Sequence, residues 1–198
     1  LEKRIPVSAG LGGGSSDAAA AWHLGRRATG NAEEADAARL VELGRIGADV
    51  PFFASRLAAA RVTGIGQVVE PMQVAANRPH VVLAHPPFGL STAAVFAELR
   101  KDEWSRAVQA GRNDLLAPAR RLRPELDDVL RLVAGAGGEP RLTGSGPTIF
   151  ALTDDPERAA SIAARLERGG LRATQTRLRS EPARIETVAP ADGDEAEE

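Results

Sequence analysis

The sequence predicts an α+β protein with a mostly antiparallel sheet that helices cover on one face. Along the second half of the chain, β-prone and helix-forming segments alternate as strand, helices, strand, helix and strand. The segment 80–85 is apolar apart from its ends, as expected for a buried strand. With 198 residues, 43% of them hydrophobic, the chain is long enough for one large or two small domains with real cores.

The first part of the chain is predicted to end at a soft domain boundary near residues 77–79. Its expected elements are a strand end at 3–7, helices at 17–28 and 32–43, a loop at 44–51, a helical turn at 51–60, and strands at 59–63 and 67–72. Gly64-Ile65-Gly66 joins the last two strands as a hairpin-like turn.

The second part is predicted to carry the sheet and its covering helices. The expected strands are 80–85, 141–143, 148–153 and 173–179, and the expected helices are 93–100, 115–122, 124–134 and 155–168. Ser91 and Thr92 read as the cap of the first of these helices. The tail 181–198 is acidic and rich in small residues towards its end, which predicts disorder.

Composition excludes several classes of function. The net charge of −2 gives no basic field for nucleic acid. The absence of cysteine excludes disulfides, thiol catalysis and cysteine-based zinc sites, and fits a reducing cytoplasm. No apolar run is long enough for a membrane span, and no signal peptide is recognisable. The expectation is a cytoplasmic protein without nucleic-acid or membrane partners, whose oligomeric state the sequence leaves unknown.

The histidines and tryptophans indicate no further site. The spacing of His23, His80 and His85 does not fit a zinc site, and no other metal-ligand set is expected from the side chains. Trp22 and Trp104 are too isolated to form a stacking platform for nucleic acid.

The most informative stretch runs from Pro6 to Ser16 and reads Pro-Val-Ser-Ala-Gly-Leu-Gly-Gly-Gly-Ser-Ser, with helix formers following at once. Glycines let backbone N–H groups approach a ligand, and the first turn of a helix leaves N–H groups unpaired at the positive end of its dipole. The stretch therefore predicts a phosphate-binding loop. Ser15 and Ser16 are expected to cap the helix or to offer hydroxyls to a phosphate-bound metal ion.

The loop by itself leaves a second interpretation open. A Gly/Ser run is often a flexible linker, although this one is short and directly precedes the helix-forming run 18–21. The loop is not a Walker motif, because no Lys-Ser/Thr follows the glycines, and consecutive glycines do not fit the dinucleotide-binding fingerprint.

Asp49 is the candidate catalytic residue, in the segment Gly47-Ala48-Asp49-Val50-Pro51. Pro51 favours an extended Val50, so the segment is held in place. A carboxylate there can accept the proton of an attacking hydroxyl in phosphoryl transfer. A turn or a helix cap is the commoner role of such an aspartate, and this reading also stays open.

A second glycine loop, Gly144-Ser145-Gly146, separates two predicted strands. The hydrogen-bond donors of this loop can face a ligand phosphate. The equal alternative is that the loop is an ordinary hairpin turn. Thr92 in isolation reads as a helix cap, and Asn113 and Asp114 read as turn and capping residues.

Taken together, these motifs resemble the GHMP kinases, which are named for galactose, homoserine, mevalonate and phosphomevalonate. Within that superfamily the chain is most similar to the family of 4-diphosphocytidyl-2-C-methyl-D-erythritol kinases. The resemblance depends on Gly10–Asp17 and on Gly47–Phe53, and the second segment selects the family. Further matches follow in the family's order over about residues 1–180: Gly64-Ile65-Gly66, Ser91-Thr92 with Val95-Phe96, Asn113-Asp114-Leu115 and Leu142–Gly146.

The resemblance implies a two-domain α+β fold with the active site between the domains. Residues 1–78 would be the remainder of a ribosomal-protein-S5-like N-terminal domain, and 79–180 a ferredoxin-like C-terminal domain. The implied activity is the ATP- and Mg²⁺-dependent phosphorylation of the 2-hydroxyl of a cytidine-diphosphate methylerythritol, a small-molecule step of non-mevalonate isoprenoid biosynthesis.

The resemblance also implies a role for each site residue. Asp49 would be the catalytic base, and Thr92, Gly144, Ser145 and Gly146 would lie on the substrate side. The residues implied to wrap the ATP phosphates are Pro6, Val7, Ser8, Ala9, Gly10, Leu11, Gly12, Gly13, Gly14, Ser15 and Ser16.

The chain departs from the family in three places. The family's N-terminal segment, with a catalytic lysine and the residues that hold cytosine, is expected to precede Leu1. Gln67 stands where the family often has an acidic residue, and Pro147 where a small residue is usual. Two alternatives therefore remain: another GHMP kinase of the homoserine or mevalonate type, or a catalytically impaired fragment without the lysine.

Overall fold

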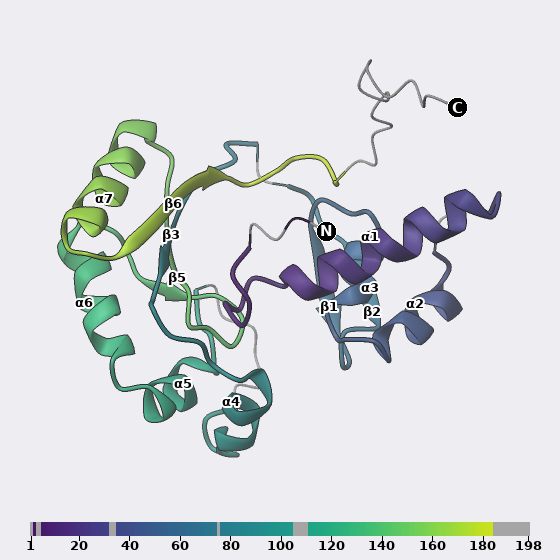
Figure 1. Cartoon of the computed structure of the whole chain (residues 1–198), viewed down its shortest axis with the longest axis horizontal. Helices are drawn as coiled ribbons and strands as arrows, with labels where there is room; N and C mark the ends of the chain where they lie inside the picture. Colours follow the sequence, from purple (N-terminus) through teal and green to yellow (C-terminus); the bar gives the residue numbers. More distant parts are fainter. Residues whose placement is uncertain (1, 3–4, 32–34, 75, 105–110, 184–198) are drawn as a thin grey trace, which may run out of the picture.

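Figure 1 shows the protein as a computed structural model, in which residues 2, 5–31, 35–74, 76–104 and 111–183 are described. Their helices and strands form two groups, with the first glycine loop running between them (Figure 1). The mixture of helices with antiparallel strands confirms the predicted α+β class.

The first group is a small helical layer on a β-hairpin. Its elements are α1 (Gly13–Ala28), α2 (Ala37–Gly44), α3 (Val50–Ala54), β1 (Ala60–Thr63) and β2 (Val68–Pro71). Helices α1 and α3 pack together, and their small residues Ala19 and Ala54 are almost fully buried. This close packing fixes the start of α1 relative to the start of α3, the two points that carry the phosphate loop and Asp49.

The hairpin has the predicted strands and turn. Strands β1 and β2 are antiparallel, from Ala60 opposite Pro71 to Thr63 opposite Val68. Gly66 in the turn has φ +115°, and a Cβ there would lie 1.8 Å from the Ala48 carbonyl oxygen. Glycine is therefore required at this position, because it lets the turn support the segment before Asp49.

In the described part of the chain, the second group is a four-stranded antiparallel sheet of order β4-β5-β3-β6 with four helices. The strands are β3 (His80–His85), β4 (Arg141–Leu142), β5 (Ile149–Thr153) and β6 (Arg172–Arg177), and the helices are α4 (Thr92–Glu98), α5 (Leu116–Leu122), α6 (Leu126–Gly135) and α7 (Pro156–Arg168). Helices α6 and α7 cover one face of the sheet, as predicted (Figure 1). The strand β3 pairs with β5 and β6, and its residues Val81, Val82 and Ala84 are at most 6% exposed, as expected from its apolar sequence.

The helix α7 shows how the sequence encodes this layer. Asp155 caps its N-terminus by accepting hydrogen bonds from the backbone N–H groups of Glu157 and Arg158. Ala159, Ile162 and Leu166 recur at helical spacing and are at most 1% exposed, so this face packs on the sheet.

Several expected boundaries are wrong at the N-terminal end. Residues 5–7 of the expected strand 3–7 are not a strand, because Pro6 cannot donate to a ladder and the chain turns at Ser8, which has φ +55°. The first helix begins at Gly13, four residues earlier than expected. Residues 35 and 36 of the expected helix 32–43 are not helical, and α2 begins at Ala37, because Asp36 accepts a hydrogen bond from the Arg39 backbone N–H and caps the helix there.

Parts of two predictions lie outside the described residues: the beginnings of the strand at 3–7 and the helix at 32–43. Most of the tail 181–198 lies outside them too, since the description ends at residue 183. The boundary near residue 78 falls between β2 and β3 and stays a prediction.

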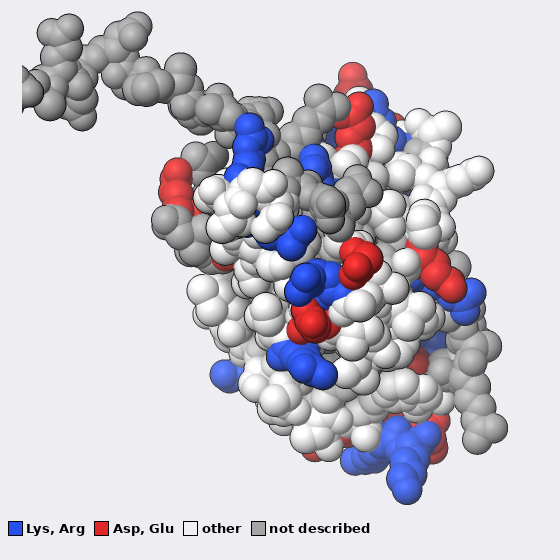
Figure 2. Space-filling view, turned by 90° about the vertical axis from the view of Figure 1, so that its right-hand side faces the viewer, with Lys and Arg blue, Asp and Glu red and all other residues white. Residues whose placement is uncertain are grey.

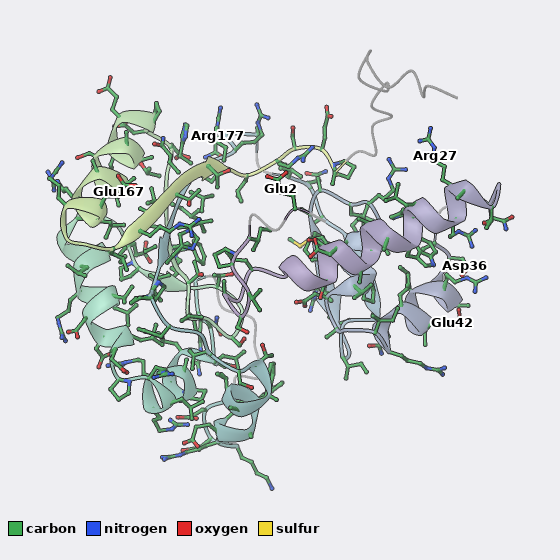
Figure 3. All side chains as sticks on the ribbon, in the orientation of Figure 1. Glu2, Arg27, Asp36, Glu42, Glu167 and Arg177 are labelled. Carbon is green, nitrogen blue, oxygen red and sulfur yellow. The ribbon has the colours of Figure 1, made fainter. Side chains whose placement is uncertain are left out.

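Charge is mixed on the face of the protein that Figure 2 shows. The face in Figure 2 carries basic and acidic side chains interspersed, with neither sign dominant. Arg27, Asp36 and Glu42 lie at the outer end of α1 and α2, whereas Glu167 and Arg177 lie on the sheet side (Figure 3). Among the described residues, no helix is long and apolar enough to cross a membrane.

Candidate active site

One cleft brings together most of the residues that the sequence singles out. It has a volume of about 460 Å³ and lies where the two groups of elements meet. Residues 6–15, Asp49, Thr92, Gly144 and Ser145 all line it. Segments that are far apart in the sequence therefore form a single site.

The first glycine loop ends in the N-terminus of α1. Gly12 is the N-cap residue with φ +66°, and it provides no side-chain cap. The backbone N–H of Ser16 donates to the Gly12 carbonyl oxygen over 2.9 Å, so intrahelical pairing starts there. The backbone N–H groups that come before Ser16 in the first turn of α1 have no carbonyl oxygen of the helix to donate to. They point out of the N-terminus of α1, at its cleft end. Together with the dipole of this 16-residue helix, they form a suitable cradle for a phosphate group.

Asp49 lies beside this helix terminus. It is exposed to the cleft, and its carboxylate approaches Gly12, where an added Cβ would be 3.9 Å from Oδ2. Asp49 occupies the N-cap position of α3, but its side chain makes no capping hydrogen bond there. The carboxylate is thus available for a ligand, which weakens the interpretation of Asp49 as a structural cap.

The two glycine loops are joined directly. The Thr143 hydroxyl donates to the Gly10 carbonyl oxygen over 2.9 Å, and the Thr148 backbone N–H donates to the Ala9 carbonyl oxygen over 3.3 Å. Gly10 has φ +70°, and a Cβ there would lie 2.6 Å from the Thr143 carbonyl oxygen and 2.7 Å from that of Gly146. The loops pack backbone to backbone, so the second loop supports the first.

Asn113 fixes the second glycine loop from the other side. Its Nδ2 donates to the carbonyl oxygens of Leu142 at 3.0 Å and Gly144 at 2.8 Å, while its Oδ1 accepts from the Leu115 backbone N–H at 2.9 Å. The sequence interpretation as a turn residue describes the last of these bonds. The two long-range bonds were missed, because a single sequence gives no signal for them.

Thr92 contributes its hydroxyl to the site and does not cap its helix. Ser91 is the N-cap of α4, where its hydroxyl accepts from the Ala94 backbone N–H at 3.4 Å. The Thr92 Oγ1 lies 2.9 Å from the Ser145 Oγ, and Ser145 is only 6% exposed. This hydroxyl pair links α4 to the second glycine loop at the cleft wall.

Two predicted site residues do not line the cleft. Ser16 lies in the first turn of α1 and donates its hydroxyl back to the Gly13 carbonyl oxygen over 2.8 Å. Gly146 packs behind Gly10. The expectation that Ser15 and Ser16 cap the helix is wrong, because the helix begins before both of them.

The cleft also contains apolar residues that the sequence argument did not assign. Phe96 and Leu115 line it, and Phe53 packs against Gly12, where an added Cβ would lie 3.0 Å from the ring.

Burial lowers the pKa of His23 below its usual value, while its hydrogen bond to the Ala54 carbonyl oxygen opposes that shift. A neutral His23 therefore ties α1 to α3.

The cleft offers few oxygen ligands for a metal ion. Among the described residues, no group of three or more His, Cys, Asp or Glu side chains could hold one. Ser15 lines the cleft near the segment that carries Asp49. A Cβ added to Gly47, two residues before Asp49, would lie 3.6 Å from the Ser15 Oγ. This sparse set fits a Mg²⁺ ion that obtains most of its ligands from phosphate and water.

Comparison with known families gives two matches in chain order. The family model of the GHMP kinases N-terminal domain matches residues 1–56, and that of the GHMP kinases C-terminal region matches residues 94–171. The first match contains the phosphate loop and Asp49, and the second contains the second glycine loop.

Curated relatives carry the name 4-diphosphocytidyl-2-C-methyl-D-erythritol kinase. The protein from Rhodopseudomonas palustris (strain BisB18) is 37% identical over 192 residues, which covers 82% of this chain and 61% of the relative. That from Nitrobacter winogradskyi is 39% identical over 191 residues, which covers 83% and 60% respectively. The chain thus spans about three fifths of the length of these relatives.

Two solved structures resemble the chain. A 4-(cytidine 5'-diphospho)-2C-methyl-D-erythritol kinase matches with a TM-score of 0.72 and 33% identity, over 88% of this chain and 68% of that one. A homoserine kinase from Cytophaga hutchinsonii matches with a TM-score of 0.66 at 18% identity, over 90% and 69% respectively. At that identity the second likeness concerns the fold alone.

Proposed function

The chain belongs to the GHMP kinase family, and we propose that it transfers the γ-phosphoryl group of ATP to the 2-hydroxyl of 4-diphosphocytidyl-2-C-methyl-D-erythritol. The observation that carries this proposal is the position of the Asp49 carboxylate beside Gly12, at the cleft end of α1. A base next to a phosphate cradle is the arrangement that phosphoryl transfer to an alcohol requires. The printed names of the relatives supply the substrate.

The first glycine loop binds the phosphates of ATP in this proposal. Backbone N–H groups at the start of α1 donate to phosphate oxygens, and the helix dipole favours their negative charge. Mg²⁺, when bound, neutralises charge on the β- and γ-phosphates, and Ser15 is the hydroxyl of this chain that would help to hold it.

Asp49 orients the substrate hydroxyl and accepts its proton. The hydroxyl oxygen forms a bond to the γ-phosphorus, and the bond from that phosphorus to the bridging oxygen of ADP breaks. The proton moves to the Asp49 carboxylate, so the products are a phosphate ester and ADP. Thr92 and the second glycine loop form the wall on the substrate side.

We also propose that this reaction takes place in the cytoplasm. The sequence contains no cysteine, as is compatible with a reducing compartment. The substrate is a free small molecule, so the site needs no nucleic-acid or membrane partner.

The test uses protein expressed from the complete reading frame. ADP formation is measured with ATP, Mg²⁺ and 4-diphosphocytidyl-2-C-methyl-D-erythritol, and Asp49→Asn is compared with Asp36→Asn. Asp36 caps α2 outside the cleft and provides a matched change. Asp49→Asn is expected to lower kcat by about 10² or more, within the range of general base catalysis, and Asp36→Asn to leave it close to that of the parent.

Two outcomes would contradict the proposal. Near-normal turnover by Asp49→Asn would remove the assigned role of this residue. A preference for homoserine or mevalonate over the cytidine-containing substrate in the same assay would reassign the substrate within the family.

A further inference from the structure

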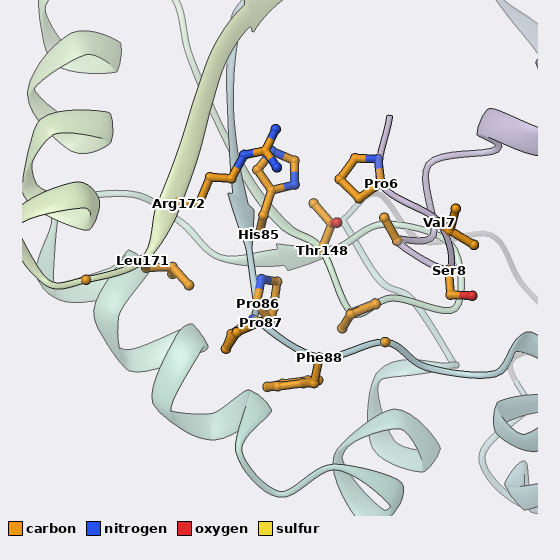
Figure 4. Close-up of a pocket in the computed structure, with 14 residues that line it drawn as sticks. Pro6, Val7, Ser8, His85, Pro86, Pro87, Phe88, Thr148, Leu171 and Arg172 are labelled. Carbon is orange, nitrogen blue, oxygen red and sulfur yellow. The ribbon is translucent and has the colours of Figure 1, made fainter. Parts of the chain in front are cut away.

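A second cavity lies behind the first glycine loop, on the side of the sheet. It has a volume of about 430 Å³, which is within the usual range for small-molecule sites. Figure 4 shows its main walls: the loop residues Pro6, Val7 and Ser8, the segment His85–Phe88, and the start of β6 at Leu171 and Arg172. This cavity, here called the rear pocket, shares only residues 6–9 of its described lining with the active-site cleft.

One side of the rear pocket is basic and polar. Arg172 pairs with His85 across the β3–β6 ladder, and Figure 4 shows its guanidinium group beside the imidazole ring. Desolvation and the neighbouring Arg172 charge lower the pKa of His85, which keeps the imidazole neutral and leaves the positive charge on Arg172. None of the described residues that line the pocket carries a carboxylate, so this guanidinium group meets no acidic side chain in the wall.

The His85 ring adds a polar atom that lacks a partner. Its Nε2 lies 3.0 Å from the Thr174 hydroxyl, whereas its buried Nδ1 has no hydrogen bond within the described part of the chain. Buried polar atoms without partners are rare in folded proteins, and a bound water, ion or ligand is one explanation for such an atom. The Thr148 hydroxyl points towards Pro6 from the opposite wall (Figure 4).

The rest of the wall is apolar. Pro86, Pro87, Phe88 and Leu171 line it together with Pro147. A pocket with one guanidinium group at an apolar surface is suited to a ligand with an oxyanion head and a compact apolar body, since guanidinium binds carboxylate and phosphate in a bidentate manner.

The rear pocket shares a wall with the active-site cleft. Residues 6–9 line both cavities, so the same four residues contact a ligand on either side. Ser8 within this wall has φ +55°, a conformation that costs energy in a residue with a side chain and is held by its surroundings. A ligand in the rear pocket that shifts residues 6–9 would shift the phosphate loop that follows them.

We propose that the rear pocket binds a small organic oxyanion through Arg172, and that its occupation changes the affinity of the phosphate loop for nucleotide. The ligand is a phosphate or a carboxylate with an apolar body. This binding does not require the kinase activity, because it depends on the rear pocket alone.

Binding is tested by calorimetry with phenyl phosphate, benzoate, inorganic phosphate and benzyl alcohol, on the full-length protein with the nucleotide site saturated by a non-hydrolysable ATP analogue. Phenyl phosphate is expected to bind and benzyl alcohol not to bind, and comparison with benzoate tells a phosphate site from a general oxyanion site. Arg172→Ala is expected to weaken the binding at least tenfold, and Arg172→Lys to weaken it less. Arg172 is exposed, so the fold tolerates both changes.

The control is Arg177→Ala, which removes the same charge from the far end of β6, where Arg177 donates to the Arg78 carbonyl oxygen. The proposal is overturned if Arg172→Ala binds phenyl phosphate as tightly as the parent, or if Arg177→Ala loses as much. For the coupling, phenyl phosphate is expected to change the affinity for the ATP analogue at least threefold in the parent and not in Arg172→Ala. An unchanged affinity in the parent rejects the coupling.

Discussion

The hydroxyl of Thr143 donates a hydrogen bond to the carbonyl oxygen of Gly10, and this bond of 2.9 Å joins residues 133 positions apart. It ties the second glycine loop to the loop that enters α1. The phosphate cradle is therefore held by both groups of elements, and its stability depends on residues far from it in the sequence.

Removal of this bond is expected to loosen the cradle. In Thr143→Val the shape of the side chain is kept, but the Gly10 carbonyl oxygen loses its donor, at a cost of about 1 kcal/mol for a typical hydrogen bond. Affinity for a non-hydrolysable ATP analogue should fall about fivefold, as measured by calorimetry. Thr143→Ser retains a hydroxyl and should stay close to the parent; an equal loss in both variants would show that the hydrogen bond to Gly10 is not the cause.

Gly10 is expected to tolerate no side chain. A Cβ there would lie 2.6 Å from the Thr143 carbonyl oxygen, and the residue has φ +70°, so Gly10→Ala must separate the two loops. Its melting temperature should fall by several degrees, corresponding to about 2 kcal/mol or more.

Gly25→Ala is the matched control for this change. Gly25 lies inside α1, and no described atom outside its own helix backbone lies within 4 Å of the position that a Cβ would take. Alanine should stabilise the helix there by about 0.5–1 kcal/mol. A fall in melting temperature as large as that of Gly10→Ala would show that the clash at Gly10 is not the cause.

Asn113 should be more important for stability than an exposed asparagine. Asn113→Ala removes the donor of two carbonyl oxygens and the acceptor of one N–H group, at a cost of about 1–3 kcal/mol. Asn77→Ala, which removes one exposed bond to Asp154, should cost about 0.5 kcal/mol or less. Chemical denaturation of both variants measures the difference, and similar values would contradict a special role of Asn113.

The ion pair of Glu103 with Arg121 predicts a loss of stability in acid. Hydrogen bonding from Arg121 lowers the pKa of Glu103 from 4.5 to about 2. Because the folded-state pKa is below the unfolded one, the pair stabilises the protein fully above about pH 4.5, and this contribution is lost as the pH falls towards 2.

The test compares Glu103→Gln with the parent by denaturation between pH 7 and pH 2. The variant should be less stable than the parent at pH 7, and the two curves should converge at low pH. Glu42→Gln, in an exposed pair with Arg39 on α2, should give a smaller difference at pH 7. Curves for Glu103→Gln and the parent that stay parallel over the whole range would contradict the assignment.

Local patterns predicted much of the fold correctly. The strand at 80–85 and the helix from Asp155 are recognisable because apolar runs and capping residues act over a few neighbours. Predictions failed at the start of the chain, where Pro6 and Ser8 turn the backbone and Gly12 starts the helix early. Ala9 and Gly10, which lie between these residues, are bonded to Thr148 and Thr143, more than a hundred positions away.

The sequence by itself determined the chemistry available at the site: a glycine loop at a helix start, and a carboxylate at Asp49. The expected extended conformation of Val50 is wrong, because Val50 begins α3. It left open whether Asp49 is a cap and whether Thr92 is one. The tertiary structure decided both points: Ser91 rather than Thr92 caps α4, and Asp49 makes no capping hydrogen bond although it occupies the N-cap position of α3. Thr92 pairs with Ser145, and Asp49 leaves its carboxylate free of the α3 cap and facing Gly12. Residue types are local properties of a chain, whereas partners are fixed only when the two groups of elements pack together.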